Sequence, residues 1–177
     1  SSYGIAVDHL LLLALHERNS AAAARLAPLF RRTGGRGDAE GAFDWVLAEL
    51  LEDSAAMREV RARIPSMPAA SLFWLSAMPQ LETGGVDVSA MAVAQLARNA
   101  STVGEARRAA NAARALALNA GRPTAAEQAS QRAVESGGPS AFIDFVRAVA
   151  ASYWDGDSAA GEAALHRLAT APGDPRD

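Results

Sequence analysis

Apolar residues recur along this chain at the spacing of a helix face and not in the strict alternation of a strand. Phe43 to Leu51 and Ala159 to Leu168 are examples of the pattern. Residues three and four positions apart lie on one side of an α-helix, so each such segment can bury one face. The pattern predicts about ten helices. They cover residues 3–18, 20–32, 38–52, 54–64, 69–81, 87–99, 102–119, 123–136, 139–154 and 157–170.

The clearest turn is Gly121-Arg122-Pro123, between the segments 102–119 and 123–136. Glycine readily adopts the left-handed conformation that ends a helix. Proline cannot continue a helix but is tolerated at the start of the next one. Thr124 and Glu127 have the spacing of a capping box, and so do Thr102 and Glu105. We therefore expect two antiparallel helices joined by a very short turn.

Similar turns recur along the sequence. They contain Gly37, Gly85, Gly121 and Gly156, which are 48, 36 and 35 residues apart. The fifth residue after each of these glycines is small, namely Ala42, Ala90, Ala126 and Gly161. Small side chains at these positions let two helix backbones approach closely. A period near 35 residues with a helix–turn–helix unit is typical of an α-solenoid.

Composition supports an all-α protein. The chain of 177 residues contains 43 Ala, but only 18 residues that are Val, Ile or Thr. Alanine favours helices and β-branched residues favour strands. The absence of cysteine excludes disulfides and thiolate metal sites. The longest apolar run, Leu10 to Leu15, is too short to span a membrane.

These features also suggest a setting for the chain. All 17 basic residues are Arg, and this bias together with the many Ala and Gly residues is typical of a GC-rich bacterial genome. No signal peptide is visible, so we expect a cytoplasmic protein. The chain begins Ser1-Ser2-Tyr3 without Met, and we expect it to be a segment of a larger bacterial regulatory protein.

Charge alternates in blocks along the chain. Residues 1–37 carry +3, 38–53 carry −6, 54–87 are neutral, 88–134 carry +4 and 135–177 carry −4. Such blocks suit helices that attract their neighbours, or a locally charged groove. The net charge of −3 argues against general nucleic-acid binding, which needs a basic face.

The last 110 residues or so contain the elements of a known repeat. The unit from Glu105 to Gly138 has the helix end ALALNAG, the Gly-Arg-Pro turn, small Ala126 and Ala133, and a closing Gly-Gly-Pro. The next unit, 139–170, contains YWDGDSAAGEAALHRL. Both units resemble the tetratricopeptide repeat. The aromatic residue and Leu-Gly pair of that family are replaced by Ala113-Arg114 and Ala150-Ala151, so another helical-hairpin solenoid stays open as an alternative.

The resemblance implies one TPR-like domain over residues 1–170. Its best repeats are 105–138 and 139–170, the region 1–65 is degenerate, and 171–177 form a tail. It also implies a non-enzymatic module that binds a protein or peptide in a concave groove, with no metal and no cofactor. The groove positions it implies include Arg108, Asn111, Ala115, Asn119, Ile143, Val146, Arg147, Ala150 and Trp154. Arginine and asparagine there suit an acidic segment or a C-terminal carboxylate. The alternative is a structural segment that self-associates as a homo-oligomer.

Other interpretations of the same residues are weaker. His9 and His16 lie about 10 Å apart along a helix, too far to share a metal ion. Arg36-Gly37-Asp38 spells an integrin-binding tripeptide, but Gly37 is expected to mark a turn and Asp38 to cap a helix. Gly34 to Gly37 lacks the lysine and the preceding strand of a phosphate loop.

Two further groups of residues also have a structural interpretation. Arg107, Asn111 and Arg114 share a helix face that is either solvated, peptide-binding or, less readily, DNA-binding. Asp44, Glu49, Glu52 and Asp53 wrap around a helix and do not form a hydrolase site. We expect Trp45, Trp74 and Trp154 to lie in the core or between helices, with Phe73, Trp74 and Met78 forming a buried stripe.

Overall fold

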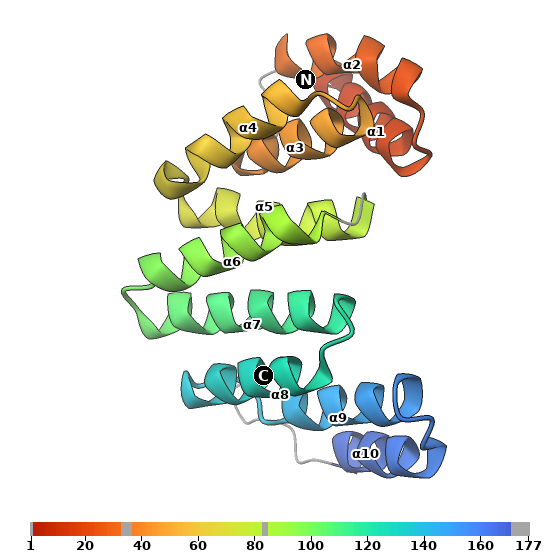
Figure 1. The fold of residues 1–177 in the computed structure, drawn as a ribbon, viewed down its shortest axis with the longest axis vertical. Helices are drawn as coiled ribbons and strands as arrows, with labels where there is room; N and C mark the ends of the chain where they lie inside the picture. Colours follow the sequence, from red (N-terminus) through yellow and green to blue (C-terminus); the bar gives the residue numbers. More distant parts are fainter. Residues whose placement is uncertain (1, 33–36, 83–84, 171–177) are drawn as a thin grey trace. The chain divides into compact units, whose positions relative to one another are not determined.

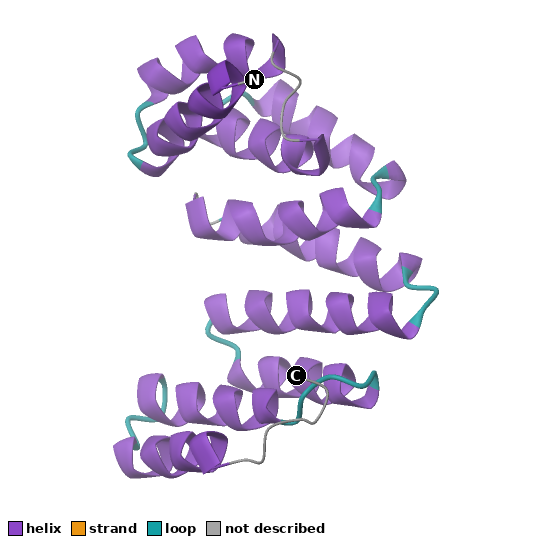
Figure 2. Ribbon diagram, turned by 180° about the vertical axis from the view of Figure 1, so that it is seen from behind, coloured by secondary structure: helices purple, strands orange, loops and turns teal. Residues whose placement is uncertain are grey.

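The computed structural model describes residues 2–32, 37–82 and 85–170, and these residues fold almost entirely into helices (Figures 1 and 2). The helices are α1 (Ser2–His16), α2 (Ser20–Arg32), α3 (Glu40–Leu50), α4 (Ser54–Arg63), α5 (Ala69–Glu82), α6 (Val86–Asn99), α7 (Val103–Asn119), α8 (Pro123–Glu135), α9 (Ala141–Tyr153) and α10 (Ser158–Thr170). Short 3-10 turns, Gly37–Ala39 and Ile64–Ser66, precede α3 and follow α4. No strand occurs within the described ranges. The prediction of an all-α chain with ten helices is therefore confirmed for this part of the sequence.

The chain divides into two compact units, Ser1–Gln95 and Leu96–Asp177. We call them unit 1 and unit 2. The boundary falls near the end of α6, so most of α6 belongs to unit 1. The prediction of one repeat domain over residues 1–170 stays a prediction.

Unit 1 has a core of large side chains. The helix α3 packs against α4 and α5, and also contacts α1 and α2. Trp45, Leu11 and Leu72 are among its fully buried side chains. The rings of Phe30 and Phe43 join α2 to α3, with centroids 4.9 Å apart. Burial of this apolar area is the main driving force for folding of the unit.

Unit 2 has a core made mostly of alanine. Each helix from α7 to α10 packs against the next one in the chain, as Figures 1 and 2 show for the α7–α8 and α9–α10 pairs. Ala117, Ala126 and Val146 form a buried cluster in which α7, α8 and α9 meet, with Leu118 packed against it. Alanine fills little volume, so such a core requires closely spaced helix backbones.

Most of the small residues predicted at close helix contacts are buried. Ala42 and Ala126 are fully buried, and Gly161 is buried as well. A Cβ atom on Gly161 would lie 2.1 Å from Ser152 Oγ and 3.5 Å from the carbonyl oxygen of Ala148, both on α9. The prediction is wrong at Ala90, which is exposed on α6.

Local sequence signals set the turns of unit 2. Gly121 has φ +65° and ends α7, as predicted, with the Arg122 amide donating to the carbonyl of Ala117. Pro123 starts α8, but the predicted Thr124–Glu127 capping box is wrong. Arg122 is the N-cap of α8 and makes no side-chain cap, so Thr124 already lies inside the helix.

Two other helix starts also test the predicted caps. Thr102 and Glu105 do form a capping box at the start of α7. The predicted cap by Asp38 is wrong, because a 3-10 turn intervenes and Ala39 precedes α3. Gly37 does adopt a positive φ of +53°, as a turn glycine should.

An ion pair in unit 1 joins the basic block 1–37 to the acidic block 38–53, and a second one joins the acidic block to the neutral block 54–87. Asp44 on α3 lies 3.4 Å from Arg31 on α2 and 3.4 Å from Arg63 on α4. One carboxylate from the acidic block therefore links helices from the blocks on either side. Both arginines are exposed, so each pair contributes little, about 0–1 kcal/mol.

The predicted aromatic stripe is only partly buried. Met78 is buried, but Phe73 and Trp74 are 44% and 45% exposed and contact each other edge to face. The stripe prediction is wrong for these two rings, because α5 buries the side that carries Leu72 and Leu75. Trp45 is fully buried, as predicted.

The close α9–α10 contact can be tested by filling it. We expect Gly161→Val to lower the free energy of unfolding by about 1–3 kcal/mol, because the added atoms meet α9. The matched control is Gly104→Val on α7, where a Cβ would meet nothing within 4 Å. Urea denaturation measures both variants. Equal stability of the two variants would contradict the close contact.

The capping box predicts a pH effect. Hydrogen bonds from the amide and hydroxyl of Ser101, and then from the amide of Thr102, hold the pKa of Glu105 below its usual range. A lowered pKa in the folded state means that this stabilisation is present above the unfolded pKa and is lost as the pH falls through the folded value. We expect Ser101→Ala to raise the pKa of Glu105, measured by NMR titration. An unchanged pKa would show that the hydroxyl does not contribute.

Candidate functional site

The candidate binding surface is a stripe of residues on α7 in unit 2. Four of the predicted groove positions, Arg108, Asn111, Ala115 and Asn119, follow one another at intervals of three or four residues. They therefore share one side of the helix. Arg108, Ala115 and Asn119 are exposed, and Asn111 is half-buried. We call these four residues the α7 stripe.

Alanines position the α7 stripe. Ala109 and Ala112, and also Ala110 and Ala117, are buried beside it. These small side chains pack α7 into unit 2 and leave the stripe side open. The capping box at Thr102 fixes where the helix begins. Gly104 lies four residues before Arg108, on the same side of α7, and has no side chain.

Two polar groups of the α7 stripe have unused bonding capacity. Arg108 makes neither a hydrogen bond nor an ion pair with any residue that the structure describes. The side-chain Oδ1 of Asn111 is buried and has no hydrogen-bond partner. A buried acceptor without a donor costs free energy.

The other two arginines of α7 differ in their surroundings. Arg107 donates from Nη1 to the carbonyl oxygen of Gly137, at 3.2 Å, and so ties α7 to the loop after α8. Arg114 is half-buried, and desolvation lowers its pKa. The face shared by Arg107, Asn111 and Arg114 is therefore not a purely solvated face.

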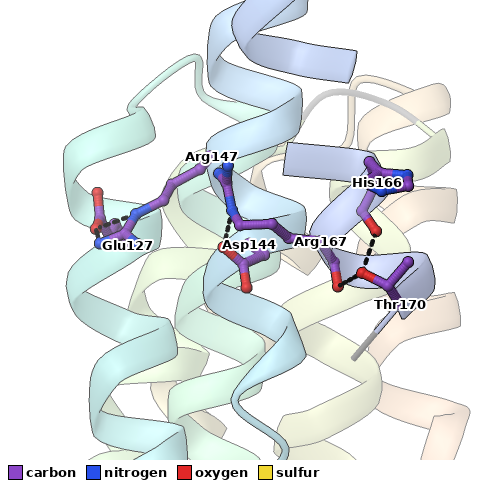
Figure 3. A network of polar contacts seen from close by, with 6 residues as sticks. All are labelled: Glu127, Asp144, Arg147, His166, Arg167 and Thr170. Carbon is purple, nitrogen blue, oxygen red and sulfur yellow. Dashed lines mark hydrogen bonds and ion pairs between the residues drawn. The ribbon is translucent and has the colours of Figure 1, made fainter. Parts of the chain in front are cut away.

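Arg147, a predicted groove residue, is paired. Its Nε and Nη2 lie 2.9 and 2.6 Å from Glu127 Oε1 on α8. Asp144, three residues earlier on α9, pairs with Arg167 of α10 at 3.4 Å. Figure 3 shows this row of charges across α8, α9 and α10. Thr170 then donates to backbone carbonyls of His166 and Arg167 at the end of α10. Arg147 thus already has a carboxylate partner.

The remaining predicted positions on α9 differ from one another. Val146 is 1% exposed and belongs to the core, so the prediction that it lines a groove is wrong. Trp154 caps the end of α9 and is 41% exposed. Its Nε1 lies 3.3 Å from the position of a Cβ on Gly121, so the ring covers the α7–α8 turn. Ile143 and Ala150 are half-buried.

The weaker candidates gain no support from the geometry. His9 and His16 are exposed, and the described residues contain no group of three or more His, Asp or Glu placed to hold a metal ion. Arg36 of the tripeptide lies outside the described residues, as do Gly34 and Gly35. No helix in the described ranges is long and apolar enough to cross a membrane.

Two of the four carboxylates considered for hydrolysis have structural partners, and the other two line one cavity. Asp44 pairs with two arginines. Asp53 caps α4 by accepting from the amides of Ala55 and Ala56. Glu49 and Glu52 line a cavity of about 500 Å³ with Leu15, Arg18, Leu50 and Met57. Two of its lining residues, Arg18 and Glu52, have positive φ values of +52° and +55°, which non-glycine residues rarely adopt and which no sequence pattern predicted.

Comparison with known proteins identifies no relative. No family model, no curated protein and no solved structure matches the chain. The resemblance to the tetratricopeptide repeat therefore stays a prediction.

The contact between Trp154 and the α7–α8 turn can be tested at Gly121. We expect Gly121→Ala to lower stability by about 1 kcal/mol, because φ is positive, and to change the fluorescence of Trp154. Gly137→Ala is the matched control, since Gly137 has φ +77° but nothing within 4 Å of a Cβ. Both variants should lose similar stability, whereas only the first should alter the emission. The two other tryptophans are replaced by Phe in this experiment so that one ring is observed.

Proposed function

We propose that unit 2 is a non-enzymatic binding module of helical hairpins that recognises a polypeptide. In this proposal the α7–α8 and α9–α10 hairpins are successive TPR-like repeats, and the α7 stripe contacts the ligand. The ligand carries an acidic side chain or a C-terminal carboxylate. The proposal places the chain in a larger bacterial regulatory protein of the cytoplasm.

The observation that carries the proposal is the pair of unused groups on the α7 stripe. Arg108 presents an exposed guanidinium with no carboxylate partner among the described residues. Asn111, three residues later, holds an acceptor that has no donor. A peptide carboxylate fits the planar guanidinium fork of Arg108, and a backbone N–H can donate to the Asn111 oxygen once this half-buried side chain turns outward.

The shape of the stripe suits a chain lying along it. Gly104 and Ala115, before and after the two polar residues, project little or nothing beyond the helix surface. A peptide backbone can therefore approach α7 closely and still reach Arg108 and Asn111. Arg147 contributes less, since Glu127 already neutralises its charge.

A second candidate function is self-association. Leu10 and Leu13 on α1 are 52% and 51% exposed, and Leu165 on α10 is 50% exposed. Exposed leucines favour contact between copies of the chain when they form a continuous patch. Sedimentation over a range of concentrations decides this point, because a mass that rises with concentration supports it.

The binding proposal is tested with the whole chain and a displayed library of peptides with free C-termini. Selected peptides are then titrated by fluorescence anisotropy. We expect Arg108→Ala and Asn111→Ala each to weaken binding by about tenfold, the effect of losing one hydrogen bond to a charged or buried group. We also expect binding through Arg108 to weaken as salt is added.

The matched control is Arg132→Ala on α8. Arg132 is also exposed, so this variant loses the same charge from the surface of the same unit. It should bind the selected peptides as the unchanged chain does. Equal losses in Arg108→Ala and Arg132→Ala would show that only net charge matters. Selection of no peptide at all would contradict the function.

A further inference from the structure

A cavity in unit 1 has an apolar floor and a charged rim. It measures about 500 Å³ and lies where α1 ends, α3 ends and α4 begins. Leu15 is 1% exposed, and Leu50 and Met57 are half-buried, so these apolar side chains form the floor. Arg18 and Glu52 also line the cavity and are exposed. The volume suits a small organic ligand, since ligand pockets measure about 300–1,000 Å³.

Arg18 and Glu52 occupy the same position in two equivalent turns, α1–α2 and α3–α4. In each turn the amide of this residue donates to the carbonyl three residues earlier, and its φ is left-handed, +52° for Arg18 and +55° for Glu52. The next residue, Asn19 or Asp53, caps the following helix. Glycine is the usual residue at such a position. The turns alone therefore do not explain why both carry a long charged side chain.

The charges of Arg18 and Glu52 border one space without pairing. Neither the guanidinium of Arg18 nor the carboxylate of Glu52 makes a hydrogen bond or an ion pair with any residue in the described ranges. Glu49 also lines the cavity, but its Oε2 lies 3.0 Å from the position of a Cβ on Gly85, which is outside the cavity. Glu49 has another interaction as well. One guanidinium and one carboxylate are therefore open to a ligand.

The mixed charge of the rim defines the chemistry of the ligand. A simple anion is repelled by Glu49 and Glu52, and a simple cation is repelled by Arg18. A molecule with one charge of each sign gains an attractive partner at both ends. The floor adds the requirement for an apolar group, because such a group gains free energy by leaving water there. A small zwitterion with an apolar side chain meets all of these requirements.

We propose that this cavity binds a free α-amino acid with an apolar side chain. The α-carboxylate of the ligand accepts hydrogen bonds from the guanidinium of Arg18, whose planar fork fits two oxygens. The α-ammonium group donates to the carboxylate of Glu52. The apolar side chain of the ligand covers Leu50 and Met57 above Leu15. This site lies in unit 1 and does not depend on the function proposed for the α7 stripe.

The test follows the ε-methyl signals of the four methionines by NMR in the full chain. Single Met→Leu variants assign the signals, and of the four only Met57 lines this cavity. Leucine is titrated as the probe, and we expect a saturable shift of the Met57 signal alone. Leucinamide lacks the carboxylate, N-acetylleucine lacks the ammonium group, and glycine lacks the apolar side chain. Each of these three should bind about tenfold more weakly than leucine, because each loses one of the three interactions.

Paired variants locate the two charged groups. We expect Arg18→Gly and Glu52→Gly each to weaken leucine binding by about tenfold, because each removes a charge-assisted bond. Glycine favours the left-handed turn, so both variants keep the fold. In Arg18→Gly leucine should also lose its advantage over leucinamide, and in Glu52→Gly its advantage over N-acetylleucine. The controls are Arg25→Ala and Glu59→Ala, which remove the same charges from exposed positions outside the cavity and should bind leucine as the unchanged chain does.

Several results would overturn the proposal. One is the absence of a saturable shift of the Met57 signal with leucine. Another is equal affinity for leucine and leucinamide, which indicates a site for cations, or for leucine and N-acetylleucine, which indicates a site for anions. A third is equal affinity for leucine and glycine, which shows that the apolar floor does not contribute. Equal losses in Arg18→Gly and Arg25→Ala would show that only the net charge of the unit matters.

Discussion

Close approach of helices through alanine and glycine is the constraint on which unit 2 depends. Ala117 and Ala126 are buried where α7 meets α8, and Gly161 lies so near α9 that a Cβ would overlap Ser152 Oγ. Small side chains bury little apolar area each. The unit compensates by bringing backbones together, so that many weak contacts form along each helix pair. One side of α7 then remains open, and that side carries Arg108 and Asn111.

Polar contacts between neighbouring helices depend on individual side chains and not on net charge. The pair of Asp44 and Arg31 follows the block pattern, because it joins the acidic block to the basic block 1–37, whereas Arg63 comes from the neutral block 54–87. The pair of Glu127 and Arg147 runs against the block pattern. Glu127 lies in the basic block 88–134, and Arg147 lies in the acidic block 135–177. The net charge of a block counts the side chains on every face of a helix. An ion pair forms only between the faces that meet.

The same distinction explains how well the candidate site was predicted. Helical spacing placed Arg108, Asn111 and Asn119 on one side of α7, and the structure keeps that side open. Spacing also placed Val146 and Arg147 in a groove on α9. Val146 instead fills the core, and Arg147 binds Glu127. Periodicity defines which residues share a face, but it does not define which face a neighbouring helix covers.

The sequence by itself determined the helices and some of their ends. Alanine content and apolar spacing fixed the all-α class, and Gly121 and the Thr102–Glu105 box fixed the ends of α7, because these signals act within one turn of the backbone. The tertiary structure decided which side chains lost water and which found partners. Val146 lost water in the core, Arg147 found Glu127 on α8, and Trp45 Nε1 was left beside Gly85 without an acceptor. These outcomes depend on residues far apart in the chain that meet only when the helices pack.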